Sequence, residues 1–252
     1  MTITIIGAGN VGFHLANALQ QTPHQILQLF SRNDQRFEAF STALAEKGVT
    51  DWNEINTQSD IYIIAVNDQA IEEVSLQLQQ IGVKGIVVHT SGATSIQVLK
   101  QHAEYGIFYP LQTFSQSKIV DWSSIPFCID GNTERVKLRL SELAQTLSPT
   151  MHLMNDEQRQ ALHVAAVFVN NFTNHLLTLG EQICQDFGVP FDVLQPLIRA
   201  TFEKVQSISP KIAQTGPAIR GDKATQQKHL ALLQNHPDRQ LLYRLISESI
   251  AK

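Results

Sequence analysis

Short apolar runs alternate with longer amphipathic runs along the first 153 residues of the chain. This alternation is typical of a parallel β-sheet that is covered by helices. Runs such as IYIIAV and GIVV are apolar at every position, which favours strands buried on both faces. The pattern predicts strands at residues 2–6, 25–30, 60–66, 85–89, 107–109, 126–129 and 150–153, with a weak one near Val49.

After Asn155 the strand pattern disappears and only helical periodicity remains. We expect helices at residues 156–187, 191–207, 225–235 and 238–251, because Gly and Pro residues separate these amphipathic runs. The prediction is therefore an α/β domain over residues 1–154, followed by an all-α helical domain over residues 155–252. Since four helices alone cannot bury every apolar face, we expect a homodimer formed through the helical domain.

Composition limits the classes of function. The chain has 252 residues, 43% of them hydrophobic, and a net charge of −4, so it has enough apolar residues for a core and no basic run for nucleic acid or an anionic membrane. The longest apolar stretch, 161–169, is broken by His163 and too short to anchor the chain in a membrane. Two distant cysteines and the lack of a signal segment favour the cytoplasm. The histidines show no metal-ligand spacing, so we expect no metal.

A glycine motif follows the first predicted strand. Gly7, Gly9 and Gly12 form G-x-G-x-x-G where that strand gives way to an amphipathic helix, which is typical of a Rossmann-like dinucleotide site. The amides of Asn10 and Val11 belong to the first turn of the helix and are expected to bind the pyrophosphate. The first domain is therefore predicted to be a Rossmann-like, mostly parallel sheet.

The end of the second strand predicts which dinucleotide is bound. An acidic residue there would bind the ribose 2′-hydroxyl of NAD, but this chain has Ser31 and Arg32. Both side chains can bind the 2′-phosphate of NADP, so we predict NADP as the cofactor. The alternative is that Arg32 is only a solvated loop charge.

Polar residues also follow the fourth and fifth predicted strands, at the sheet edge where such folds bind ligands. We expect Val66 and Asn67 to flank the ribose, and His89, Thr90 and Ser91 to lie near the nicotinamide. The alternative for His89, Thr90 and Ser91 is that they only bond to the loop backbone.

Three polar residues interrupt the apolar helix predicted over 156–187. His163, Asn170 and Asn174 are spaced i, i+7 and i+11, which places them along one line of a regular α-helix. We expect this stripe to line a cleft, with His163 as general acid or base and the asparagines orienting a substrate oxygen. Hydrogen bonding between helices, or a polar dimer seam, is the alternative.

The stretch 216–222 is the glycine- and proline-rich part of the helical half. Arg220 and Asp222 are expected either to clamp and orient an anionic substrate or to pin the turn as an ion pair. The sequence does not distinguish these two roles.

The chain resembles one bacterial family across essentially its whole length. The features that carry the resemblance are IIGAGNVG, Ser31-Arg32, HTSG, the YPLQTFS run at 109–115, the HVAAVFVNNF helix and TGPAIRGD. This family pairs a Rossmann-like domain with a helical domain of unknown function, and the resemblance implies NADP oxidoreductases of the deazaflavin-dependent type.

More distantly, the layout is similar to pyrroline-5-carboxylate reductases and to hydroxyisobutyrate and 6-phosphogluconate dehydrogenases. The resemblance implies dimers or larger assemblies built through the helical domain. In the hydroxyacid dehydrogenases, a catalytic Lys lies four residues before an Asn on the first helix of that domain. This chain has no Lys between Asp156 and Phe187, so that mechanism does not carry over.

These observations predict a cytoplasmic NADP-dependent oxidoreductase that transfers a hydride between NADP(H) and a small, unidentified substrate or a deazaflavin. The alternative is a nucleotide-binding sensor or structural dimer without turnover. Oxidation of NADPH by an acceptor distinguishes the two.

Overall fold

The computed structural model describes residues 1–40, 42–118 and 120–252, and these residues form two compact units. The first unit is Met1–Ala166 and the second is Val167–Lys252. The predicted fold class, a mostly parallel α/β sheet followed by an all-α region, is confirmed. None of the helices in the described ranges has both the length and the apolar character needed to cross a membrane.

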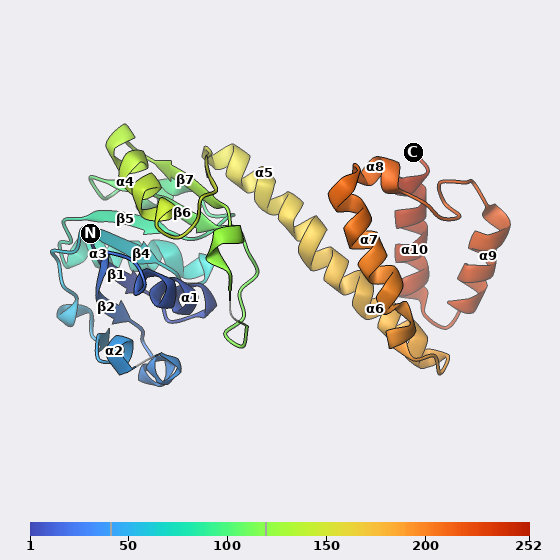
Figure 1. The fold of residues 1–252 in the computed structure, drawn as a ribbon, viewed down its shortest axis with the longest axis horizontal. Helices are drawn as coiled ribbons and strands as arrows, with labels where there is room; N and C mark the ends of the chain where they lie inside the picture. The colour runs from blue at the N-terminus through green and yellow to red at the C-terminus, as the bar shows by residue number, and fades with distance from the viewer. Residues whose placement is uncertain (41, 119) are drawn as a thin grey trace. The chain divides into compact units, whose positions relative to one another are not determined.

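An eight-stranded sheet organises the first unit, in the order β3-β2-β1-β4-β5-β6-β7-β8 (Figure 1). Neighbouring strands are parallel, except that β6 and β7 are antiparallel. The strands are β1 (Thr2–Ile6), β2 (Gln25–Phe30), β3 (Gly48–Val49), β4 (Ile61–Ile64), β5 (Ile86–His89), β6 (Tyr105–Pro110), β7 (Phe127–Gly131) and β8 (Met151–Leu153). Because β2 and β4 lie on opposite sides of β1, the carboxyl ends of β1 and β4 border the crevice where open α/β sheets bind ligands.

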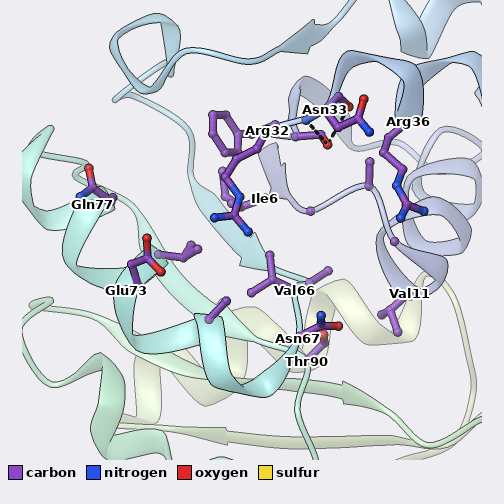
Figure 2. A pocket seen from close by; sticks show the side chains of 18 of the residues that line it. Ile6, Val11, Arg32, Asn33, Arg36, Val66, Asn67, Glu73, Gln77 and Thr90 are labelled. Atoms are coloured by element: carbon purple, nitrogen blue, oxygen red, sulfur yellow. Dashed lines mark hydrogen bonds between the residues drawn. The ribbon is translucent and has the colours of Figure 1, made fainter.

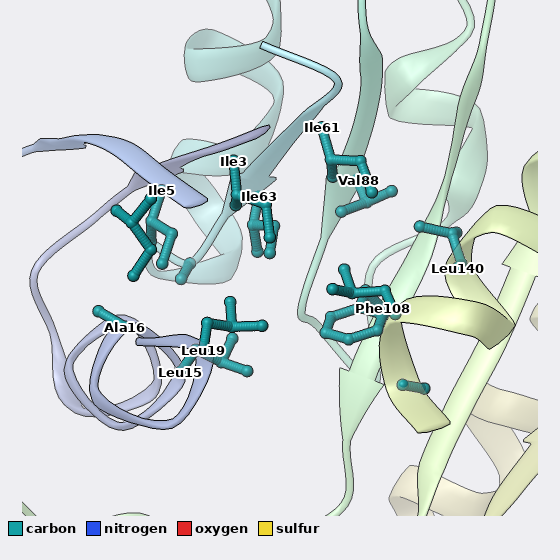
Figure 3. Close-up of a cluster of buried hydrophobic side chains, with 14 of the residues drawn as sticks. Ile3, Ile5, Leu15, Ala16, Leu19, Ile61, Ile63, Val88, Phe108 and Leu140 are labelled. Atoms are coloured by element: carbon teal, nitrogen blue, oxygen red, sulfur yellow. The ribbon is translucent and has the colours of Figure 1, made fainter. Parts of the chain in front are cut away.

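Helices cover both faces of the sheet, as the continuous apolar runs predict. Ile3 and Ile5 of β1 belong to the core formed with α1 (Asn10–Leu19) and α4 (Glu134–Gln145), part of which Figure 3 shows. Ile6, at the end of the same strand, packs instead in the core formed with α3 (Ile71–Gln80). Side chains that alternate between two buried faces explain why every residue of β4 is buried.

The helix expected over 156–187 differs from a single α-helix. It consists of α5 (Asp156–Ala166), a π-helical segment (Val167–Phe172) and α6 (Thr173–Asp186). The compact first unit extends to Ala166 because Asp156 and Arg159 of α5 bond to residues 94–96. The domain boundary at 154/155 stays a prediction from the strand pattern.

The second unit contains α6, α7 (Gln195–Ser207), α8 (Pro210–Ala213), α9 (Lys223–Leu232) and α10 (Pro237–Ile250), with a short 3₁₀ turn (Phe191–Leu194) before α7. The sequence pattern did not predict α8. The structure describes every residue of helices α6 to α10, and none of these residues is buried. Apolar faces of these helices are therefore exposed in the single chain.

Candidate functional site

The three motif glycines occupy three different environments at the end of β1. Gly7 has a φ of +115°, and a Cβ there would lie 2.4 Å from the carbonyl oxygen of Ala65. A Cβ on Gly12 would lie 1.9 Å from the carbonyl oxygen of Gly7. A Cβ on Gly9 would meet nothing within 4 Å. Two glycines thus permit the tight turn and the close packing, and Gly9 leaves open space above the loop.

The helix that begins in this loop has free donors. Gly9 is the N-cap of α1, and no side chain caps it. The first N–H groups of a helix have no partner within the helix and carry the positive end of its dipole. The loop therefore has the open backbone and the donors that a pyrophosphate needs.

A pocket of about 500 Å³ lies above this loop. Figure 2 shows that it receives side chains from the ends of several parallel strands and from α3. The predicted site residues that line it are Gly7, Gly9, Asn10, Val11, Ser31, Arg32, Val66, Asn67 and Thr90. The structure thus brings together nine of the twelve residues that the sequence assigned to the dinucleotide.

Two arginines line the pocket, and only Arg32 was predicted from the sequence. Arg32 follows β2, and Arg36 lies in the 3₁₀ turn Asp34–Ala39 (Figure 2). Both residues are exposed, and neither forms an ion pair with a carboxylate within the described ranges. The signal that could have identified Arg36 is its position four residues after Arg32 in a polar segment.

The neighbouring polar residues shape the segment that carries these arginines. The Ser31 hydroxyl donates to the carbonyl of Asn33, at 2.9 Å, and accepts from its amide, at 3.2 Å. The side chain of Asn33 in turn accepts from the amide of Gln35, at 3.0 Å. Ser31 lines the pocket and also fixes the turn that holds Arg32.

Asn67 and Thr90 lie at the opposite end of the labelled side chains in Figure 2 from Asn33. Both follow central strands, β4 and β5, so they lie at the carboxyl edge of the sheet. Asn10 also lines the pocket, and its side-chain amide donates to the carbonyl of Phe114 at 2.9 Å.

His89, Ser91 and Gly12 do not line the pocket. His89 is fully buried, and its Nδ1 accepts from the amide of Ser91 at 3.2 Å. Burial lowers the pKa of His89 to about 4, so the imidazole is neutral near pH 7. The Ser91 hydroxyl donates to Thr94 and accepts from the amides of Ala93 and Thr94. His89 and Ser91 thus hold the loop that presents Thr90 and Gly92.

His163 lies against that same loop. A Cβ on Gly92 would lie 2.8 Å from His163 Nδ1 and 2.8 Å from the ring of Tyr109. His163 Nδ1 is buried and has no hydrogen-bond partner within the described ranges. Burial raises the pKa of Tyr109 to about 12, so its hydroxyl is protonated. Tyr109 begins the YPLQTFS run, and the sequence pattern alone assigned it no role at the site.

Asn170 and Asn174 are exposed, and the π-helical segment separates His163 from Asn174. The predicted stripe assumed a regular α-helix throughout. A π-helix forms i→i+5 bonds and therefore turns less per residue, so the three residues do not keep the spacing of one straight α-helical line. Val169, in the apolar run of this helix, is 71% exposed in the single chain.

The turn at 216–222 is built around Asp222. Its carboxylate caps α9 by accepting from the amide and the hydroxyl of Thr225, at 3.0 and 2.7 Å. These bonds lower the pKa of Asp222. Gly216 and Gly221 adopt φ values of +113° and +67°, which a side chain rarely tolerates. Asp222 therefore supports the turn, and Arg220 does not pair with it among the ion pairs of the described residues.

The fold defines a Rossmann-like unit with a pocket at its glycine loop, followed along the chain by a helical unit. A family model described as a Rossmann-like domain matches residues 1–113, and one described as a domain of unknown function (DUF2520) matches residues 125–250. The chain belongs to the DUF2520 family.

Several solved structures share this fold. A candidate NADP oxidoreductase of Bacteroides fragilis is 38% identical, with a TM-score of 0.89 over 99% of this chain and 97% of its own. An imine reductase of Myxococcus stipitatus in complex with NADP⁺ is 15% identical, with a TM-score of 0.69 over 100% and 92%. A pyrroline carboxylate reductase of Plasmodium falciparum with NADP bound is 12% identical, with a TM-score of 0.61 over 100% and 98%. The last two likenesses concern the fold alone.

A glycerol-3-phosphate dehydrogenase [NAD(P)+] of Thermoanaerobacter is 31% identical over 117 residues. The match covers 41% of this chain and 35% of the length of that enzyme.

Proposed function

We propose that this protein is an NADP-dependent oxidoreductase that transfers a hydride between NADP(H) and a small substrate or a deazaflavin. One observation carries the proposal: a single pocket combines an open glycine loop at a helix N-terminus with two exposed guanidinium groups. The Bacteroides relative, with its name as a candidate NADP oxidoreductase, supports the same class of activity.

Each part of the pocket has a proposed role in binding. The amides at the start of α1, beside Gly9, bind the pyrophosphate. Arg32 and Arg36 attract the 2′-phosphate, because both are cations without a carboxylate partner among the described residues. Asn67 and Thr90 then lie toward the nicotinamide end. When bound, NADP(H) supplies the hydride chemistry.

His163 is the proposed proton donor or acceptor for the substrate. Its position against Gly92, two residues after the pocket residue Thr90, supports this role. An imidazole can exchange a proton near neutral pH, which reduction of a carbonyl or an imine requires. Asn170 and Asn174 are proposed to orient a substrate oxygen, and their substitution by Ala should then raise KM.

The protein is further proposed to be a homodimer that assembles through residues 155–252. The support is that helices α6 to α10 bury no residue within one chain, although each carries apolar side chains. We place the protein in the cytoplasm, where its two free cysteines would remain reduced.

Titration of the purified protein with NADPH and NADH tests the cofactor. NADPH should bind more tightly, and a panel of carbonyl, imine and deazaflavin acceptors should reveal NADPH oxidation. Equal affinities would contradict the choice of NADP. Tight NADPH binding without oxidation by any acceptor class would favour a sensor or structural dimer.

A further inference from the structure

One face of α5 carries three polar residues that lie against the loop after β5. Asp156, Arg159 and His163 are spaced i, i+3 and i+7, so they follow one side of the helix. The Asp156 carboxylate accepts from the hydroxyl of Ser95 and, at 3.1 Å, from the amide of Ile96. His163 lies against Gly92 in the same loop.

Arg159 is fully buried, yet most of its donors are unused. Its Nη2 donates to the carbonyl of Thr94 and pairs with Asp156 Oδ1 at 2.8 Å. Its Nε and Nη1 are buried without a partner in the part of the chain that the structure describes. Folded proteins rarely leave buried donors unpaired, because such groups lose their bonds to water and gain nothing in return.

A second unpartnered nitrogen lies one helical turn away. His163 Nδ1 is also buried without a partner among the described residues, and residues four apart on a helix are neighbours. Arg159 thus has two N–H donors without an acceptor, and His163 has one ring nitrogen without a hydrogen-bond partner, among the described residues. The nearby carboxylate of Asp156 cannot supply all of them, since it already accepts from Ser95, Ile96 and Arg159.

The guanidinium of Arg159 has one carboxylate partner among the described residues, Asp156. Burial raises the pKa of Tyr109 to about 12 and that of Cys128 to about 11. The nearby positive charge of Arg159 acts in the opposite direction and lowers both pKa values, but burial has the larger effect. These two residues face each other across β6 and β7, and both are uncharged near pH 7. No neighbouring thiolate or phenolate therefore competes for the guanidinium.

We infer that Arg159 binds an anionic group of the substrate, a carboxylate, next to His163 and the loop at the carboxyl end of β5. This inference rests on the proposed oxidoreductase function, because it names the substrate class of the same site. The reacting carbon then lies toward Thr90 and the dinucleotide pocket. The substrate is a small carbonyl or imine compound that carries a carboxylate.

Binding of a simple probe tests this inference without turnover. The protein saturated with NADP⁺ is titrated by calorimetry with propanoate, propanamide and inorganic phosphate at constant ionic strength. We expect propanoate to bind at least tenfold more tightly than the neutral amide, since a charge-assisted hydrogen bond is lost with the charge. Phosphate distinguishes a carboxylate site from a phosphate site, and tighter binding of phosphate would overturn the assignment.

Substitutions at Arg159 test whether propanoate binds at this residue. Arg159→Gln should weaken the binding of propanoate roughly tenfold or more. Arg159→Lys keeps the charge and should weaken this binding less. Arg135→Gln is the matched control, because Arg135 is a 74% exposed arginine of the same unit, and it should bind propanoate like the wild type.

If Arg159→Gln does not fold, a measurement on the wild-type protein still tests the inference. Propanoate should shift the Nε–H resonance of Arg159, assigned through Arg159→Lys, and propanamide should not. Propanoate binding that is absent, matched by propanamide, or unchanged in the Arg159 variants would overturn the inference. NADPH binding and oxidation are measured separately, so a failure of the proposed function is recognised on its own.

Discussion

At the scale of single residues, neighbouring positions at the end of β5 differ in what they contact. The His89 side chain is turned into the protein and neutral, whereas Thr90 faces the pocket. Gly92 then brings the backbone close to both Tyr109 and His163. Within these four residues, His89 supports the loop, Thr90 contacts the pocket, and Gly92 lies close to the proposed catalytic histidine.

The arginines of the pocket should determine the preference for NADPH. Arg32→Ala should weaken the binding of NADPH by roughly 1–3 kcal/mol and leave the binding of NADH nearly unchanged, because only NADPH carries the 2′-phosphate. The exposed position of Arg32 favours the lower end of this range. Arg36→Ala should act in the same direction. Calorimetric titration of each variant with both dinucleotides measures this, and equal losses for NADPH and NADH would contradict the assignment.

Substitution of His163 should separate binding from chemistry. His163→Ala should lower kcat by about 10²–10⁴, the contribution typical of general acid–base catalysis, and leave NADPH affinity nearly unchanged. The assay requires an acceptor found in the substrate panel. A variant that loses thermal stability but keeps its kcat would instead assign His163 a structural role.

At the scale of elements, the turn from β1 to α1 shows why a motif needs a structure to be interpreted. The three glycines look equivalent in the sequence. At two of them, neighbouring backbone occupies the space where a Cβ would lie, and at the third this space is open. The helix start also carries no capping side chain, so its donors remain available to a ligand.

This difference predicts opposite outcomes for two alanine substitutions. Gly12→Ala should destabilise the fold, because its Cβ would lie 1.9 Å from the carbonyl oxygen of Gly7. Gly9→Ala should keep the thermal stability of the wild type, since Gly9 has an ordinary φ of −79° and free space around it. Its methyl group should nevertheless weaken NADPH binding by about tenfold or more through the lost close approach to the pyrophosphate.

Thermal unfolding and NADPH titration of both variants measure the two effects. Gly9→Ala with the NADPH affinity of the wild type would mean that the pyrophosphate does not approach this loop.

At the scale of the whole molecule, the two units differ in how they bury apolar residues. The sheet of the first unit has cores on both faces. The second unit leaves large apolar side chains exposed along its helices, among them Val193, Leu197, Leu241 and Leu245. Exposed apolar area of this kind is typical of a surface that is covered in an assembly.

We therefore expect a mass of twice 28.1 kDa by light scattering at micromolar concentration. Leu197→Asp, at a 64% exposed position of α7, should shift the protein toward the monomer. Leu138→Asp is the matched control, because Leu138 is 61% exposed but lies on α4 of the first unit. A monomeric wild-type mass would contradict the proposed dimer.

The sequence by itself determined the class of fold and nine of the residues that line the candidate pocket. Strand and helix periods, glycine spacing and the residues at strand ends are local properties, and parallel strands necessarily bring their carboxyl ends to one edge. That is why Gly7, Gly9, Arg32, Asn67 and Thr90 could be assigned to one site before the structure was known.

Only the tertiary structure decided which side chains face the pocket and which groups meet from distant parts of the chain. Periodicity does not show that His89 turns inward, that Arg36 joins Arg32, or that a π-helical segment changes the line from His163 to Asn170. The contact of α5 with the loop after β5 depends on packing between segments about 60 residues apart, such as Arg159 and Thr94. Such contacts are set by the burial of both segments together, so neither segment alone encodes them.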